Sequence, residues 1–141
     1  MMADMCRLPP FVSAIAVVAL LAAAGESRAH HSFAAEYDAD QPVTLFGTVV
    51  GVELVNPHAW LYIEVAGDDG TTARWNIEMG SPNSLIRRGI TKSSVPVGTE
   101  LTVAGYRAKD GSHTVNSRTI TLGDGRALFS GSEGQGAPDA R

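Results

Sequence analysis

The chain has 141 residues, and its 15 acidic against 11 basic side chains give a formal net charge of −4. A mildly acidic protein without a run of Lys and Arg is unsuited to bind nucleic acid or an anionic membrane surface, since both need clustered basic charge. The single cysteine excludes a scaffold held by disulfides, and the length fits one domain with an ordinary apolar core.

The first 29 residues have the layout of a secretory signal peptide. Phe11 to Ala24 form an apolar run shorter than the roughly 20 residues of a membrane-spanning helix. The small residues Ser27 and Ala29 suit signal peptidase, so we expect cleavage after Ala29; cleavage after Ala24 and an uncleaved anchor are the alternatives. Export predicts a periplasmic or secreted protein without a membrane anchor, and Cys6 lies in the segment that is removed.

Residues 30–42 are polar and have no clear period. We expect an N-terminal arm here, with Phe33 and Tyr37 packing it down as a short helical turn or a lead-in segment. Pro42 marks its end, because the residue before a proline avoids the helical conformation.

Residues 43–55 predict a long first strand that is apolar on both faces, and Gly47 and Gly51 allow it to bend. Asn56-Pro57 predicts a turn. Two alternating strands follow at 59–65 and 72–79, joined by a hairpin loop at 67–70. In the second of these strands we expect the apolar residues to face inward and the polar residues to face outward: Thr72, Arg74, Asn76 and Glu78.

A short helix is predicted over 81–89, because Ser81 suits an N-cap, Pro82 the first helical position and Gly89 the position after the C-cap. Further strands are predicted at 100–107 and 113–122, with a short segment at 126–129 and a disordered tail at 130–141. This order predicts an all-β fold with one short helix, a five-stranded OB-like Greek-key barrel over residues 43–129. An open β-sandwich and another small antiparallel barrel are the alternatives.

Three stretches of the chain resemble a family of small exported bacterial proteins that is classed as a domain of unknown function. They are His30-His31-Ser32-Phe33, Gly47-Thr48-Val49 and Val55-Asn56-Pro57-His58-Ala59-Trp60-Leu61. The resemblance covers about the whole mature domain without the tail. It implies a small exported β domain and no established activity.

Cleavage after Ala29 would make His30 the first residue, so that an α-amine, its own imidazole and the imidazole of His31 meet at one chain end. Nitrogen donors of this kind favour copper(II), with zinc as the alternative. A third nitrogen from His58 or His113 would complete a site; the amine, the deprotonated amide and the His31 ring are another binding mode. Because both modes need an unprotonated amine, affinity should rise with pH. The alternative is a solvated polar start, a turn histidine at 58 and a solvated strand start at 113.

A second hypothesis is a ligand- or protein-binding module of the cell envelope that uses no metal and has no catalytic activity. The chain has no Gly-x-Ser-x-Gly motif and, once exported, no cysteine nucleophile, so it is not predicted to be an enzyme. Aromatic and polar side chains that alternate away from the apolar face would bind sugars, anions or peptides: Trp60, Tyr62, Arg74, Asn76 and Arg118. For Trp60 and Tyr62 the alternative is packing under the N-terminal arm.

Overall fold

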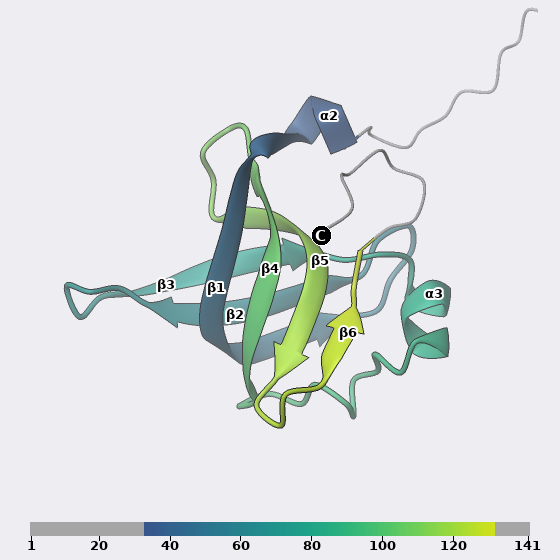
Figure 1. Cartoon of the computed structure of the whole chain (residues 1–141). Coiled ribbons are helices and arrows are strands. Elements are labelled where there is room, and N and C mark those ends of the chain that lie inside the picture. The colour runs from purple at the N-terminus through teal and green to yellow at the C-terminus, as the bar shows by residue number, and fades with distance from the viewer. Residues whose placement is uncertain (1–32, 132–141) are drawn as a thin grey trace, which may run out of the picture. The chain divides into compact units, whose positions relative to one another are not determined.

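The computed structural model describes residues 33–131, which form mainly β-structure (Figure 1). Two short helices occur in this part of the chain, α2 (Phe33–Glu36) before the first strand and α3 (Pro82–Arg87) between the third and fourth. No helix among these residues is long and apolar enough to cross a membrane. The strands are β1 (Tyr37–Glu53), β2 (Trp60–Ala66), β3 (Thr72–Glu78), β4 (Glu100–Ala108), β5 (Thr114–Leu122) and β6 (Ala127–Phe129).

The strands belong to one sheet with the order β3-β2-β1-β4-β5-β6. The neighbours in this order are antiparallel, and β3 pairs in addition with β5 in parallel, so the hydrogen bonding returns on itself in a ring. The prediction of a mostly β fold with a short helix after the third strand is therefore confirmed.

A single apolar core lies inside this arrangement, and the alternation predicted for β2 and β3 supplies much of it. Leu61, Ile63 and Ile77 have no exposed surface, and Met79, just after β3, is 1% exposed. Burial of an aliphatic side chain of this size contributes about 1.5–3 kcal/mol. The other strands and the α3 region complete the core with Val49, Ala59, Leu85, Ile90, Val95, Leu101, Val103, Val115, Ile120 and Leu122.

The first strand begins at Tyr37, so the predicted boundary at Pro42 is wrong. Pairing of β1 with β4 is irregular between Tyr37 and Pro42, and a proline is tolerated at such an irregularity because no regular ladder hydrogen bond depends on it. Local hydrogen bonds stabilise this irregular stretch. The carboxylate of Asp38 accepts from the backbone N–H of Asp40 and from Nε2 of Gln41, each at 3.0 Å.

Gly47 and Gly51 lie where β1 changes its pairing partner, as expected for glycines that allow a long strand to bend. The strand pairs with β4 up to Thr48 and with β2 from Thr48 onward, and the register shifts between Val49 and Gly51. A Cβ at Gly47 would lie 2.6 Å from the carbonyl oxygen of Glu64, so only glycine permits this close approach of β1 and β2.

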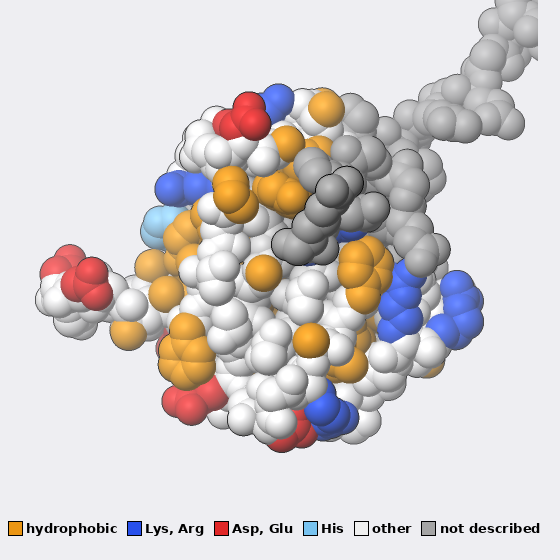
Figure 2. All heavy atoms as spheres, viewed as in Figure 1, with side chains coloured by type: hydrophobic (Ala, Val, Ile, Leu, Met, Phe, Trp, Pro, Cys, Tyr) orange, Lys and Arg blue, Asp and Glu red, His pale blue; other side chains and the backbone are white. Residues whose placement is uncertain are grey.

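The hairpin of β2 and β3 projects from the rest of the sheet and ends in the loop 67–70 (Figure 1). Its tip is acidic in the space-filling view because it carries Asp68 and Asp69 (Figure 2). At the other end of the described chain, Ser130 is fully buried and its carbonyl accepts a hydrogen bond from the N–H of Gly80 at 2.8 Å. The predicted disordered tail therefore starts too early.

Candidate functional site

Glu78, the last residue of β3, is buried at 7% exposure, which corrects the prediction that it faces solvent. One carboxylate oxygen, Oε2, accepts a hydrogen bond from the hydroxyl of Tyr37, and the other, Oε1, lies 3.2 Å from Nδ1 of His58. These residues are called the Tyr37–Glu78–His58 cluster below. A carboxylate that is removed from water is stable only when its oxygens are bonded in this way.

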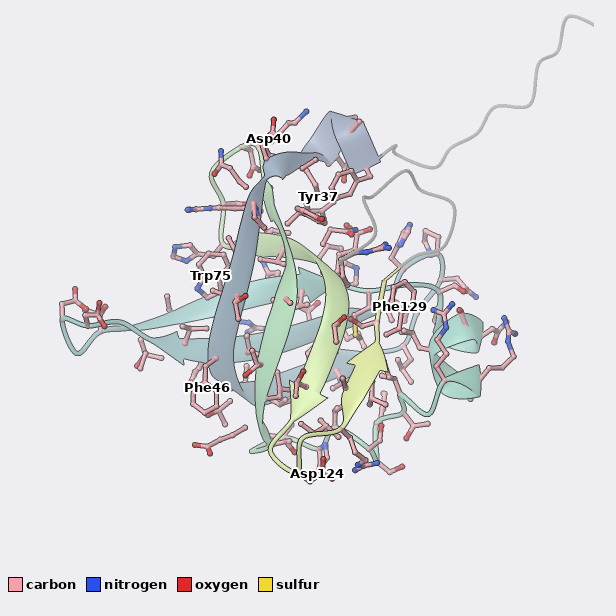
Figure 3. All side chains as sticks on the ribbon, in the orientation of Figure 1. Tyr37, Asp40, Phe46, Trp75, Asp124 and Phe129 are labelled. Atoms are coloured by element: carbon pink, nitrogen blue, oxygen red, sulfur yellow. The ribbon has the colours of Figure 1, made fainter. Side chains whose placement is uncertain are left out.

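The first residues of the described chain cover the cluster. Phe33 and Tyr37 are 3% and 4% exposed, and their rings stack with centroids 5.8 Å apart. The ring of Phe33 also meets Tyr106 of β4 edge-on at 5.4 Å. Tyr37 lies beneath α2 in Figure 3, at the end of the sheet where the described chain begins.

His58 belongs to the loop between β1 and β2, just after a cis Asn56–Pro57 bond. Its Nδ1 is 3.3 Å from the carbonyl oxygen of Met79 as well as 3.2 Å from Glu78, and its side chain is 18% exposed. The backbone that follows it is fixed at Ala59, whose N–H donates to the carbonyl of Gly80 at 3.1 Å and whose carbonyl accepts from the N–H of Met79 at 2.9 Å. The ring is therefore held at the edge of the cluster with limited access to solvent.

The hydroxyl of Tyr37 acts as the donor in this cluster. Burial raises the pKa of Tyr37 above its ordinary value of 10.0, and the hydrogen bond to Glu78 and the negative charge of Glu78 raise it further. A hydroxyl with a raised pKa keeps its proton, so Tyr37 donates to the carboxylate at neutral pH.

His113 does not join His58. Its ring stacks on Trp75 with centroids 4.6 Å apart, and the guanidinium of Arg107 lies 5.6 Å from the same indole. Trp75 and Glu78 are three positions apart in β3, and because side chains change face at every residue they point to opposite faces of the sheet. Within residues 33–131, no three histidine, cysteine or carboxylate side chains come together in a way that could hold a metal ion. His30 and His31 lie outside the described residues.

Three of the residues predicted to bind a non-metal ligand gather on the outer face of β2 and β3. Tyr62 pairs across the strands with Asn76, its hydroxyl donates to Glu53 at 3.2 Å, and the guanidinium of Arg74 lies 4.5 Å from its ring. Arg118 is elsewhere: it is 4% exposed and its guanidinium lies 5.0 Å from the ring of Phe129.

Trp60 lies two positions before Tyr62 in β2, on the same face, and pairs with Glu78 on the neighbouring strand. It borders an open hollow of about 610 Å³ between the start of the described chain and the loop that joins β4 to β5. The other residues around this hollow are Ala35, Glu36, Tyr37, Ala108, Lys109, Asp110, Ser112 and Thr114.

The sequence-based prediction missed Glu78 and gave Tyr37 only a packing role. Nothing in the local pattern distinguishes Glu78 from the other outward positions of its strand, because its burial depends on a segment some forty positions away. The usable signal was the aromatic pair of Phe33 and Tyr37 in an otherwise polar stretch, since two rings four positions apart need a surface to cover.

Residues 17–117 match the family model described as a family of unknown function, DUF6152, and the chain belongs to this family. The match agrees with the resemblance to a small family of unknown function. Comparison with curated proteins and with solved structures gives no match.

Proposed function

We propose that this member of the DUF6152 family is an exported, non-catalytic domain of the periplasm or cell exterior that binds a divalent metal. The metal is copper(II), with zinc as the alternative, and the ligands are His30, His31 and His58. The observation that supports this proposal is the Tyr37–Glu78–His58 cluster, which connects the beginning of the described chain to the His58 loop.

This connection matters for the N-terminal histidines because the chain between them and Phe33 is short. His31 precedes the buried Phe33 by two positions, and two residues span at most about 7 Å of extended chain. Phe33 stacks on Tyr37, whose hydroxyl bonds the carboxylate that also contacts His58. Between Phe33, which packs on the sheet, and His58, the third proposed ligand, there are thus only one tyrosine and one carboxyl group.

We also propose that the ring of strands is an OB-like five-stranded Greek-key barrel to which β6 is added. The closing order β1-β2-β3-β5-β4, the parallel pair of β3 and β5, and the position of α3 between β3 and β4 support this. OB domains bind ligands with the face of their second and third strands and with the first and fourth loops between strands. His58 lies in the first of these loops, and the hollow beside Trp60 is bordered by the fourth.

Copper titration of the exported, cleaved protein tests the metal proposal. Intact mass first confirms that the chain begins at His30, and calorimetry and electron paramagnetic resonance then follow binding. We expect a nitrogen-rich signal whose affinity rises with pH and falls in His30→Ala, in His58→Ala and in a chain with an added N-terminal residue. His113→Ala is the matched control and should bind normally. A mature chain that begins at Gly25, or equal affinity in all variants, would rule out the proposed site.

The hollow beside Trp60 favours a second candidate, a binding site for a sugar, an anion or a peptide without metal. The neighbouring outer face, with Tyr62, Arg74 and Asn76, would extend it. Quenching or enhancement of tryptophan fluorescence by such ligands, lost in Trp60→Leu but kept in Trp75→Phe, would support this candidate. A thermal shift with copper alone would favour the metal proposal.

A further inference from the structure

We propose that the hollow beside Trp60 binds an uncharged saccharide. The inference rests on the second candidate function, a ligand site without metal, and selects one of the three ligand classes that this candidate leaves open. The volume of about 610 Å³ lies within the range of about 300–1,000 Å³ that is usual for small-molecule sites, so a small saccharide fits.

The two rims of the hollow are tied together by hydrogen bonds. One rim is α2 with the start of β1, and the other is the loop that joins β4 to β5. The N–H of Lys109 donates to the carbonyl of Glu36 at 2.9 Å, and its Nζ donates to the carbonyl of Ala34 at 2.6 Å. The loop is also fixed from within, because Arg107 donates to the carbonyl of Gly111 at 3.0 Å. The site is thus formed before a ligand binds, and binding avoids the entropic cost of ordering its walls.

Trp60 gives the hollow an aromatic wall that is held in place. Its backbone is fixed on both sides, because it pairs with Glu53 of β1 and with Glu78 of β3. Glu78 in turn accepts a hydrogen bond from Tyr37, which borders the same hollow. Aromatic rings contribute much of the contact energy in binding sites, and a sugar ring offers them a face of apolar C–H groups. We therefore expect the sugar to stack on Trp60.

The polar side of the hollow offers partners for hydroxyl groups. Asp110, Ser112 and Thr114 line it. Hydrogen bonds from the side chain and from the backbone N–H of Ser112, the latter at 2.9 Å, lower the pKa of Asp110, so its carboxylate stays ionised at neutral pH. A carboxylate only accepts hydrogen bonds, whereas the hydroxyls of Ser112 and Thr114 donate and accept. This combination suits sugar hydroxyls, which are also donors and acceptors.

The charges around the hollow disfavour an anion. Burial raises the pKa of Tyr37, and its hydrogen bond to Glu78 and the charge of Glu78 raise it further. The negative charges of Glu36 and Asp110 add to this shift, so the electrostatic potential at the Tyr37 wall is negative. The ammonium group of Lys109 already donates to a backbone carbonyl of α2. A phosphate or a carboxylate would therefore be repelled here.

The strands beside the hollow are already paired, which disfavours an extended peptide. Trp60 in β2 lies between β1 and β3, and Thr114 of β5 pairs with Asn76 of β3, while β5 pairs with β4 on its other side. A peptide that adds to a sheet needs a free strand edge for its main-chain hydrogen bonds. Of the three ligand classes, the saccharide is the one that the geometry and the charges of the hollow favour.

The chain has two tryptophans, and they lie on opposite faces of the sheet, so single-tryptophan variants separate the hollow from the rest. In Trp75→Phe, we expect neutral disaccharides of glucose, galactose or N-acetylglucosamine to change the fluorescence of Trp60. In Trp60→Phe, the remaining Trp75, which stacks on His113, should not respond. Calorimetry on the exported wild-type protein measures the same binding without any substitution.

Asp110→Asn tests the polar side of the hollow. Asp110 and Asp69 both precede a glycine and accept the backbone N–H two positions later, at 2.9 and 3.0 Å. Asp69→Asn, at the tip of the β2–β3 hairpin, is therefore a matched control that should bind normally. We expect Asp110→Asn to bind the disaccharide about 5- to 10-fold more weakly, since hydrogen bonds to a neutral group are roughly half as strong as those to an ionised one. Equal affinity in the two variants would overturn the role of Asp110 as a ligand-binding residue.

Charged matches of the sugar decide the ligand class. Glucuronic acid and inorganic phosphate should bind at least about 10-fold more weakly than the neutral disaccharide, because like charges repel. Tighter binding of these anions, of tetraalanine or of glucosamine alone would overturn the inference and leave the second candidate function standing. No response to any of these ligands would overturn both. The metal proposal is decided separately by the copper titration.

Discussion

Replacement of Phe33 by alanine measures how firmly the start of the described chain is packed on the sheet. Truncation of a buried phenylalanine costs about 3–5 kcal/mol in protein interiors. Phe33 is 3% exposed, so its side chain is fully buried. The variant also loses two ring contacts, at 5.8 Å with Tyr37 and at 5.4 Å with Tyr106, each of which contributes about 0.5–1.5 kcal/mol to stability. Because α2 lies at an edge of the fold and its surroundings can relax, we expect the lower end, about 3 kcal/mol.

Urea denaturation of Phe33→Ala and of Phe46→Ala provides the comparison. Phe46 is 62% exposed, so its truncation should change the free energy of unfolding by less than about 0.5 kcal/mol. Thermal unfolding should show Phe33→Ala melting roughly 10–25 °C below the wild type, since 1 kcal/mol corresponds to about 4–8 °C in a domain of this size.

A loss below about 1 kcal/mol in Phe33→Ala, similar to that of Phe46→Ala, would refute this reasoning. It would mean that α2 contributes little to the folded domain in solution. Hydrogen exchange then locates the effect, because the N–H of Lys109 donates to the carbonyl of Glu36 at 2.9 Å only while the segment is docked. Rapid exchange of this amide in the wild type would also remove the observation that supports the metal proposal.

Tyr37→Phe should lower the free energy of unfolding by about 1–3 kcal/mol in urea titrations, because Oε2 of the buried Glu78 loses its donor. Burial raises the folded-state pKa of Tyr37 above its ordinary value of 10.0, so this stabilisation is complete below pH 10.0 and is lost as the pH rises toward the folded-state pKa. Urea titrations on both sides of that pH should show the alkaline loss in the wild type and a smaller one in Tyr37→Phe; equal losses would contradict the assignment. Gly105→Ala should cost about 1–3 kcal/mol or prevent folding, since its Cβ would meet the carbonyl oxygen of Asn116 at 2.2 Å. Gly123→Ala, with its nearest neighbour at 3.9 Å, should be close to neutral in the same denaturation assay. Copper at 100 times its dissociation constant should stabilise the cleaved protein by about 2.7 kcal/mol in thermal unfolding, and a chelator should reverse this.

The parts of the fold that depend on local pattern were predictable. The alternation over β2 and β3 places Leu61, Ile63 and Ile77 in the core, because side chains on a strand change face at every residue. The α3 signals were equally local: Pro82 begins the helix and Gly89 has a φ of +84°, a conformation that glycine adopts without strain. Ser81 occupies the N-cap position but makes no side-chain capping hydrogen bond, so this signal gave the right boundary without the expected contact.

The start of β1 was not predictable from local rules. Proline is unfavourable inside a strand because it has no N–H to donate, so Pro42 predicts a boundary. The structure accommodates it where the pairing with β4 is already irregular, and the two sides of that irregularity are anchored by Tyr37 opposite Ala108 and by Pro42 opposite Tyr106. These contacts join residues far apart in the chain, and no window of neighbouring residues contains that information.

The same long-range contacts divide the outer face of β3 into two different environments. Arg74 is exposed, Asn76 is half-buried and Glu78 is buried, although all three alternate to one side of the strand. Exposure falls toward Glu78 because Tyr37, itself 4% exposed, packs at that end of the face and bonds Glu78 there. The metal proposal concerns the covered end. The ligand proposal concerns the open end near Tyr62 and Arg74 and also the hollow beside Trp60, which Tyr37 borders as well. Copper should therefore change the NMR signal of His58 while leaving those of Tyr62 and Arg74 in place, and a sugar or anion should do the reverse; a single ligand that shifts all three equally would show that the face acts as one site.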